Sequence, residues 1–172
     1  MERSAYIKLG RQRRAMIRSG AAVLVFSIGL GLCVLAPVVV AQPADPRLGS
    51  WRLVEMTVNA NAQPASNSTW IYSQEGSDLR VDVHSVTPTG RTQHWSYRTK
   101  RDGVGVRVRG NPAIDRVAVT RRSDRIDEIV YEKAGVATTT GASEISTDGQ
   151  TMTVTVRASS GGVAVGVYKR FK

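Results

Sequence analysis

The residue types that most often carry out chemistry in proteins are scarce in this sequence. His84 and His94 are its two histidines, and Cys33 is its single cysteine. A metal site needs three or four converging ligands, and a nucleophile needs an activating base beside it. Neither pattern is visible in the spacing of these residues. We therefore expect surface or structural histidines, and we expect no metal and no cofactor.

Catalytic motifs are also absent from the sequence. It contains no Gly-x-Ser-x-Gly elbow, no phosphate-binding loop and no His-Glu-x-x-His segment. Acids such as Asp82, Glu128 and Glu132 are scattered, and their spacing does not indicate a pair. We predict that the protein is not an enzyme. An active site that only the fold assembles remains the alternative.

Aromatic residues offer a more specific candidate site. Trp70 and Tyr72 are two residues apart, as are Trp95 and Tyr97, so each pair shares one face if the segment is a strand. Such residues either fill a core or line the mouth of a pocket. Both interpretations stay open for these four, whereas we expect Trp51 to be a core residue.

Apolar and polar residues alternate along most of the chain beyond position 49, which is typical of strands with one buried face. For example, Val104, Val106 and Val108 are separated by Gly105 and Arg107. Turn-forming residues such as Asp-Gly pairs interrupt these runs about every ten residues. The predicted strands are Gly49–Thr57, Ser68–Ser73, Leu79–Val86, Arg91–Lys100, Val104–Val108, Arg116–Arg122, Arg125–Lys133, Val136–Ser146, Gln150–Ser159 and Val163–Phe171.

This pattern predicts an all-β fold, a single antiparallel up-and-down β-barrel of about ten strands over residues 49–172. Residues 42–48 are predicted to be a short leader. The polar stretch Asn59–Asn67 is either a lid-like loop or a short helix over one barrel mouth. The run Arg125–Tyr131 breaks the alternation, and a β-bulge would restore its phase.

Residues 1–41 have the composition of an export signal. Six basic residues and one acid precede an apolar stretch from Ala21 to Ala41. We predict a secreted or periplasmic protein cleaved near Ala41, by ordinary or twin-arginine export. The alternative is an uncleaved membrane anchor. Without this segment the net charge falls from +10 to +5, which does not indicate a nucleic-acid partner, and no cysteine is left for a disulfide.

Several segments together resemble a known family. Gly49-Ser50-Trp51 resembles the Gly-x-Trp opening of lipocalins and related calycins, in which this tryptophan closes the barrel floor. The His94–Tyr97 segment, the Gly110-Asn111-Pro112 loop and the closing stretch Glu144–Val154 resemble small exported bacterial lipocalin-like proteins without an assigned activity. The resemblance implies a barrel and, by analogy alone, a ligand in its lumen. It also implies that Gly49 and Trp51 form the floor.

Fatty-acid-binding barrels hold a carboxylate with Arg and Tyr of their late strands, inside the barrel. Arg157, Tyr168 and Arg170 lie late in this chain, but their order departs from the Arg-x-Tyr arrangement of that family. Arg157 and Tyr168 alternate with valines. If the valines face inward, both residues face solvent; if the valines pack outward, both could line a wet cavity.

We therefore predict an exported lipocalin-like protein that binds a small apolar or amphipathic molecule in its lumen. A structural or protein-interaction barrel with a filled lumen and no ligand is the main alternative. The oligomeric state stays open. The candidate ligand-binding residues are Trp70, Tyr72, Trp95, Tyr97, Arg157 and Tyr168.

Overall fold

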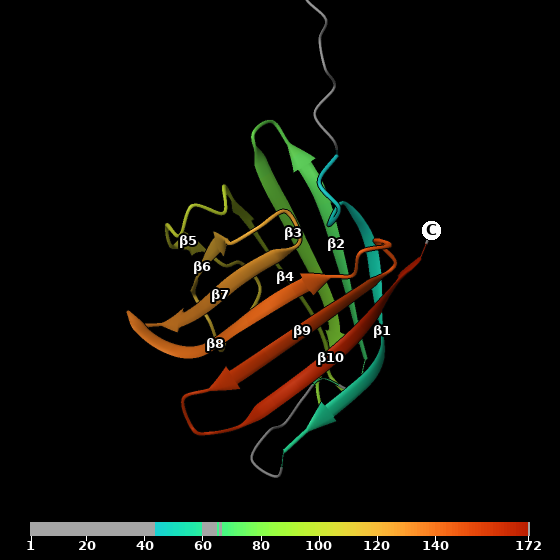
Figure 1. The fold of residues 1–172 in the computed structure, drawn as a ribbon. Helices are drawn as coiled ribbons and strands as arrows, with labels where there is room; N and C mark the ends of the chain where they lie inside the picture. The colour runs from blue at the N-terminus through green and yellow to red at the C-terminus, as the bar shows by residue number, and fades with distance from the viewer. Residues whose placement is uncertain (1–43, 60–64, 66, 172) are drawn as a thin grey trace, which may run out of the picture. The chain divides into compact units, whose positions relative to one another are not determined.

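The computed structural model describes residues 44–59, 65 and 67–171, and all regular secondary structure in this part of the chain is β-strand (Figure 1). This confirms the all-β prediction. The strands are β1 (Gly49–Val58), β2 (Asn67–Glu75), β3 (Asp78–Val86), β4 (Thr92–Thr99), β5 (Val106–Arg107), β6 (Arg116–Arg121), β7 (Ile126–Lys133), β8 (Val136–Ile145), β9 (Thr151–Ala158) and β10 (Val163–Phe171).

The ten strands form one antiparallel sheet that curls into a nearly closed up-and-down barrel. Consecutive strands pair with one another except β4 and β5, between which the seam lies, and β1 also pairs with β10. At this seam Ser96 and Arg109 exchange two backbone hydrogen bonds of 2.9 Å. The chain approaches so closely here that a Cβ on Gly110, whose φ is +82°, would lie 2.3 Å from the carbonyl oxygen of His94.

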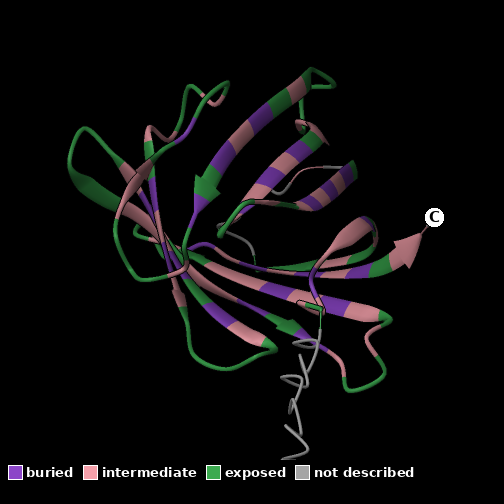
Figure 2. Ribbon diagram, turned by 90° about the horizontal axis from the view of Figure 1, so that it is seen from above, coloured by how far each residue is buried: buried purple, intermediate pink, exposed green. Residues whose placement is uncertain are grey.

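Buried and more exposed residues alternate along the strands, as Figure 2 shows. In β3, for example, Leu79, Val81 and Val83 point into the barrel and are at most 4% exposed. The sequence alternation predicted the inward set of this strand because its outward residues are polar. The inward residues of all the strands merge into one apolar core.

In β10, the inward set is the one without valines. Ala164, Gly166 and Tyr168 are buried, whereas the three valines between and before them are half-buried on the outer face. Both sets of this strand are largely apolar, so alternation in the sequence does not decide which of them is inside. The small inward residues leave space in the lumen at this strand.

The bulge predicted within Arg125–Tyr131 is absent, and that prediction was wrong. β7 pairs without interruption from Ile126 to Tyr131, and Asp127 takes an inward position at 3% exposure. The alternation of buried and exposed residues in β7 is intact, because Asp127 occupies one of the buried positions. Register shifts occur instead in β1, where Val54 is the extra residue, and in β8, where Thr138 is.

Two further expectations concern segments outside the regular strands. β5 spans two residues, Val106–Arg107, instead of the predicted five, and pairing with β6 resumes before it only as an isolated bridge between Asp102 and Thr120. Most of the predicted lid or helix falls on residues 60–64 and 66, which lie outside the described residues, as do residues 1–43 with the proposed export signal. The described residues include no helix that could span a membrane.

Candidate functional site

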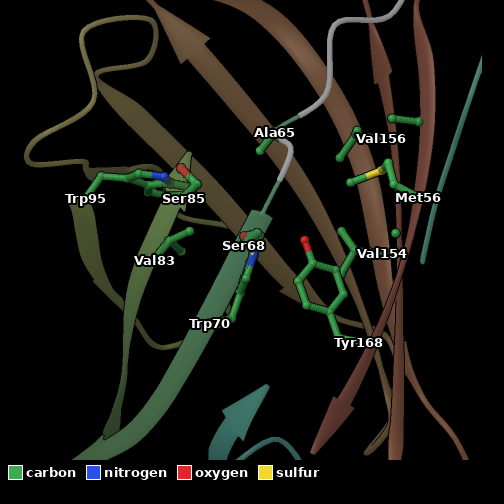
Figure 3. Close-up of a pocket in the computed structure, with 12 residues that line it drawn as sticks. Met56, Ala65, Ser68, Trp70, Val83, Ser85, Trp95, Val154, Val156 and Tyr168 are labelled. Atoms are coloured by element: carbon green, nitrogen blue, oxygen red, sulfur yellow. Dashed lines mark hydrogen bonds between the residues drawn. The ribbon is translucent and has the colours of Figure 1, made fainter. Parts of the chain in front are cut away.

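The barrel contains a cavity of about 220 Å³ near one of its ends (Figure 3). Its walls come from β1, β2, β3, β4, β9 and β10, and Ala65 contributes from the segment between β1 and β2. The wall is largely apolar. The lining residues are Met56, Ala65, Ser68, Trp70, Val83, Ser85, Trp95, Val154, Val156, Ala164, Gly166 and Tyr168.

The irregularity in β1 and the small residues of β10 together shape this cavity. Trp51 and Leu53 precede the extra residue Val54, and the shift it causes turns Met56 inward although three positions separate it from Leu53. Opposite, Gly166 leaves room that a Cβ would fill, since such an atom would lie 2.9 Å from the Tyr168 ring. The cavity therefore depends on a bulge and a glycine.

Three polar groups converge in the otherwise apolar wall. The indole nitrogen of Trp70 donates a hydrogen bond of 3.0 Å to Oγ of Ser68. The Tyr168 hydroxyl points into the cavity (Figure 3). Burial raises the pKa of Tyr168, while hydrogen bonding to Ser68 and Trp70 lowers it, and burial is the larger effect. This group is therefore neutral at ordinary pH and can both donate and accept hydrogen bonds.

Below the cavity, aromatic rings fill the barrel. Trp70 stacks on Tyr72, with ring centroids 6.1 Å apart, and Trp95 stacks on Tyr97 at 5.9 Å. Trp70 and Trp95 meet edge to face at 5.9 Å, and Tyr131 meets the edge of Trp95 at 6.1 Å. These geometries are the favourable ones for aromatic pairs. Among the described residues, the lumen thus has space near one end and is packed in its middle.

The structure brings together three of the six candidate residues. Trp70, Trp95 and Tyr168 line the cavity, while Tyr72 and Tyr97 lie beneath it at 5% exposure. Arg157 is exposed on the outer face of β9, because it pairs directly with an outward valine of β10, so it is not brought to the cavity.

Sequence analysis missed most of the remaining lining residues. Ser68 is two positions before Trp70 and therefore on the same strand face, a signal that was available. Met56 carried no such signal, because its inward position depends on the register shift in β1.

The opposite end of the barrel is closed around Trp51, which is fully buried. Its indole nitrogen donates a 2.8 Å hydrogen bond to the Arg47 carbonyl, and the Arg170 guanidinium lies 4.3 Å above its ring. Arg170 also donates to the carbonyl oxygens of Pro46, Leu48 and Gly149.

Gly49, the other residue of the predicted floor, lies against this arginine. A Cβ at this position, whose φ is +120°, would lie 2.7 Å from Nη1 of Arg170. The glycine therefore permits the close approach of the last strand's arginine to the first strand.

A buried charge network lies next to this floor. Arg47, whose side chain is 0% exposed, places Nε 2.7 Å from Oδ2 of Asp127, which is 4% exposed. Arg101 also pairs with Asp127, at 3.4 Å, and with Asp45. Burial lowers the pKa of Arg47 and raises that of Asp127, and their opposite charges counteract both shifts. Residues 45–47, predicted as a leader, thus form part of the core.

The histidines lie on the outer face of the barrel and do not line the cavity. His84 and His94 stack on the outer face of β3 and β4, with ring centroids 4.3 Å apart. Nε2 of His94 lies 3.4 Å from Oδ1 of Asp82. Among the described residues, no group of three potential ligands is placed to hold a metal ion. The cavity is therefore the candidate site.

Alkaline titration will report on the buried aromatic layer. Burial raises the pKa values of Tyr72, Tyr97, Tyr131 and Tyr168, so folding holds their protons more tightly than the unfolded chain does. Their stabilising contribution is complete below the unfolded pKa of about 10. It is lost as the pH rises from there toward the folded values. We expect tyrosinate absorbance to appear above that pH, together with unfolding.

The urea-unfolded protein is the control for this titration, because its tyrosines should ionise near pH 10. Ionisation of these four tyrosines near that pH, with near-ultraviolet circular dichroism unchanged, would contradict their burial.

Comparisons with solved structures find up-and-down β-barrels of the same fold. A variant of the fluorescent protein UnaG superposes with a TM-score of 0.51 and 17% sequence identity, covering 74% of this chain and 98% of its own. A Schistosoma mansoni fatty acid binding protein in complex with arachidonic acid gives a TM-score of 0.51, 18% identity and the same coverage. At these identities the likeness shows the fold alone.

No protein-family model matches the sequence, and no curated protein matches it either. The class defined by fold and site is therefore an antiparallel up-and-down β-barrel with an apolar cavity near one end.

Proposed function

We propose that this protein binds a small, largely apolar molecule in the cavity at the open end of its barrel. The cavity itself carries this proposal, because a barrel with a purely structural role gains stability by filling such space. Its walls combine apolar burial with a few orienting polar groups, the usual composition of ligand sites. The fatty acid binding protein of the same fold supports the class of ligand.

The chemistry of the wall narrows the ligand further. The lining residues include no Lys, Arg, Asp or Glu, and Tyr168 is neutral. A charged group inside this cavity would lose its hydration without gaining a counter-ion. The ligand part that enters is therefore neutral, with an oxygen or nitrogen atom placed to hydrogen-bond with Ser68 or Tyr168.

The volume sets a limit on ligand size. About 220 Å³ is less than the roughly 300–1,000 Å³ of pockets for drug-sized ligands. The ligand is accordingly a small molecule, or the apolar end of a longer amphipathic one whose polar end remains outside. We further propose that it is bound outside the cytoplasm, after export directed by residues 1–41. The composition of that segment supports export.

Filling the cavity should abolish binding. Ala164 lines the cavity and is 7% exposed, and its replacement Ala164→Leu places three more carbon atoms there. We expect the affinity for the neutral fluorescent probe N-phenyl-1-naphthylamine to fall at least tenfold, a loss of about 1.4 kcal/mol. Probe fluorescence titrations measure this affinity, and native mass spectrometry of protein from its own host would identify a co-purified ligand.

The control is Ala142→Leu, which adds the same atoms on β8, outside the residues that line the cavity. Its probe affinity should equal that of the original protein. If the original protein does not bind the probe and carries no ligand, or if Ala164→Leu binds as tightly as it does, the structural barrel is the better explanation.

A further inference from the structure

Several arginines lie close to the seam between β4 and β5, whose course Figure 1 shows. The register places Arg80 of β3 opposite Arg98 of β4, and Arg107 of β5 opposite Arg116 of β6. Like charges directly across a strand pair destabilise it. Arg109 follows at the backbone bridge to Ser96. Four arginines on four strands, together with Arg109 just beyond β5, thus occupy neighbouring positions.

Acidic side chains neutralise three of these arginines. Arg80 pairs with Asp82 at 2.7 Å, and Arg98 pairs with Asp78 at 3.1 Å and with Glu75 at 3.3 Å. A weaker contact of 3.7 Å joins Arg116 to Glu132. The contacts with acidic side chains explain how Arg80 and Arg98 can lie directly opposite each other.

Arg107 and Arg109 are different, because neither has an ion pair or a side-chain hydrogen bond within the described part of the chain. Both are exposed. They project from the same side of the chain at positions i and i+2, next to the paired arginines. Two guanidinium groups are therefore left with all of their donors available on one surface.

The surface between these groups is hollowed. A cleft of about 430 Å³ follows the seam, and its lining differs from that of the apolar cavity. Four arginines line it against one carboxylate, that of Glu75. The other lining residues are Ser96, Tyr97 and Val106.

We propose that this cleft binds a phosphate group, with Arg107 and Arg109 as its main ligands. A guanidinium group presents paired donors that match two oxygens of a phosphate, and two such groups two residues apart can hold it together. Bound phosphate would also offset the repulsion between Arg107 and Arg116. The phosphate belongs either to a soluble phosphoester or to a phospholipid headgroup, since both present the same oxygens.

Inorganic pyrophosphate is the probe for the soluble source, in isothermal titration calorimetry with the full chain at about 0.15 M ionic strength. The double variant Arg107→Gln and Arg109→Gln should bind it at least about tenfold more weakly, because charge-assisted hydrogen bonds are lost. A charge-matched control is Arg125→Gln with Arg157→Gln, two exposed arginines outside the cleft. Its affinity should change less than about twofold.

Sedimentation with phosphatidylglycerol vesicles, against phosphatidylcholine vesicles, tests the lipid source. Binding to the anionic vesicles that the double variant loses and the control retains would assign the site to a headgroup. The proposal is overturned if the original protein binds neither pyrophosphate nor anionic vesicles, or if both double variants weaken binding equally. If the double variant fails to fold, the two single substitutions apply the same test. Ala164→Leu should leave pyrophosphate binding unchanged, which separates this site from the cavity.

Discussion

Replacing Asp127 with asparagine should destabilise the protein by about 3–5 kcal/mol, because it leaves the buried Arg47 charge without its nearest counter-ion. Water cannot compensate, since the Arg47 side chain is 0% exposed and its Nη2 has no hydrogen-bond partner among the described residues. Equilibrium unfolding in urea measures the loss as a lower midpoint.

The neighbouring residue in β7 provides a matched control. Glu128 is exposed on the outer face and pairs with Arg122, so Glu128→Gln should leave the midpoint close to that of the original protein. The double variant Arg47→Met and Asp127→Leu removes both charges and keeps apolar volume. It should recover most of the loss, because burial disfavours the charged form of each partner. A double variant as unstable as Asp127→Asn would contradict this account.

Removing the Trp51 side chain should have an effect of similar size. Trp51→Ala deletes the largest fully buried side chain and removes the surface on which Arg170 packs. Losses of about 3–5 kcal/mol are typical when a buried aromatic residue is cut back to alanine. We expect a corresponding decrease in the urea midpoint and weaker amide protection in the paired residues of β1 and β10, measured by hydrogen exchange.

Trp51→Phe separates ring packing from hydrogen bonding at this site. Phenylalanine keeps an aromatic surface beneath Arg170 but cannot donate to the Arg47 carbonyl, which Trp51 reaches at 2.8 Å. An unpaired buried acceptor costs about 1–3 kcal/mol. The free energy of unfolding of Trp51→Phe should therefore lie between those of the original protein and Trp51→Ala. If Trp51→Ala were as stable as Trp51→Phe, the ring would not be what closes the barrel floor.

Alternation in the sequence predicted the strands but not every inward face. In β3 the apolar and polar sets are distinct, so the buried set was evident from the residues alone. In β10 both sets are apolar, and the pairing of Tyr168 with Met152 decides that Tyr168 faces inward. In β7 the pattern was intact, but a buried carboxylate resembled an interruption because its partner Arg47 is 80 residues earlier.

Only part of the candidate site could be predicted from the sequence. Trp70 and Trp95 were identifiable because each lies on the same strand face as a second aromatic residue two positions later. The cavity between them was not, because it depends on the extra residue in β1 and on the missing side chain at Gly166. Space inside a barrel results from how strands meet, and single-strand patterns do not contain that information.

The pairing of β1 with β10 has a consequence for how the chain reaches this state. Ser50 and Phe171 are register partners, so the hydrogen-bonded ring is completed by residues at nearly opposite ends of the domain. Contacts between such distant residues are slow to form, because a long loop must first be closed. Until the last strand docks, β1 and β9 are two bare edges on which another unfinished chain can assemble. Aggregation during synthesis, rather than loss of the finished barrel, is therefore the main hazard of truncation at the C-terminus.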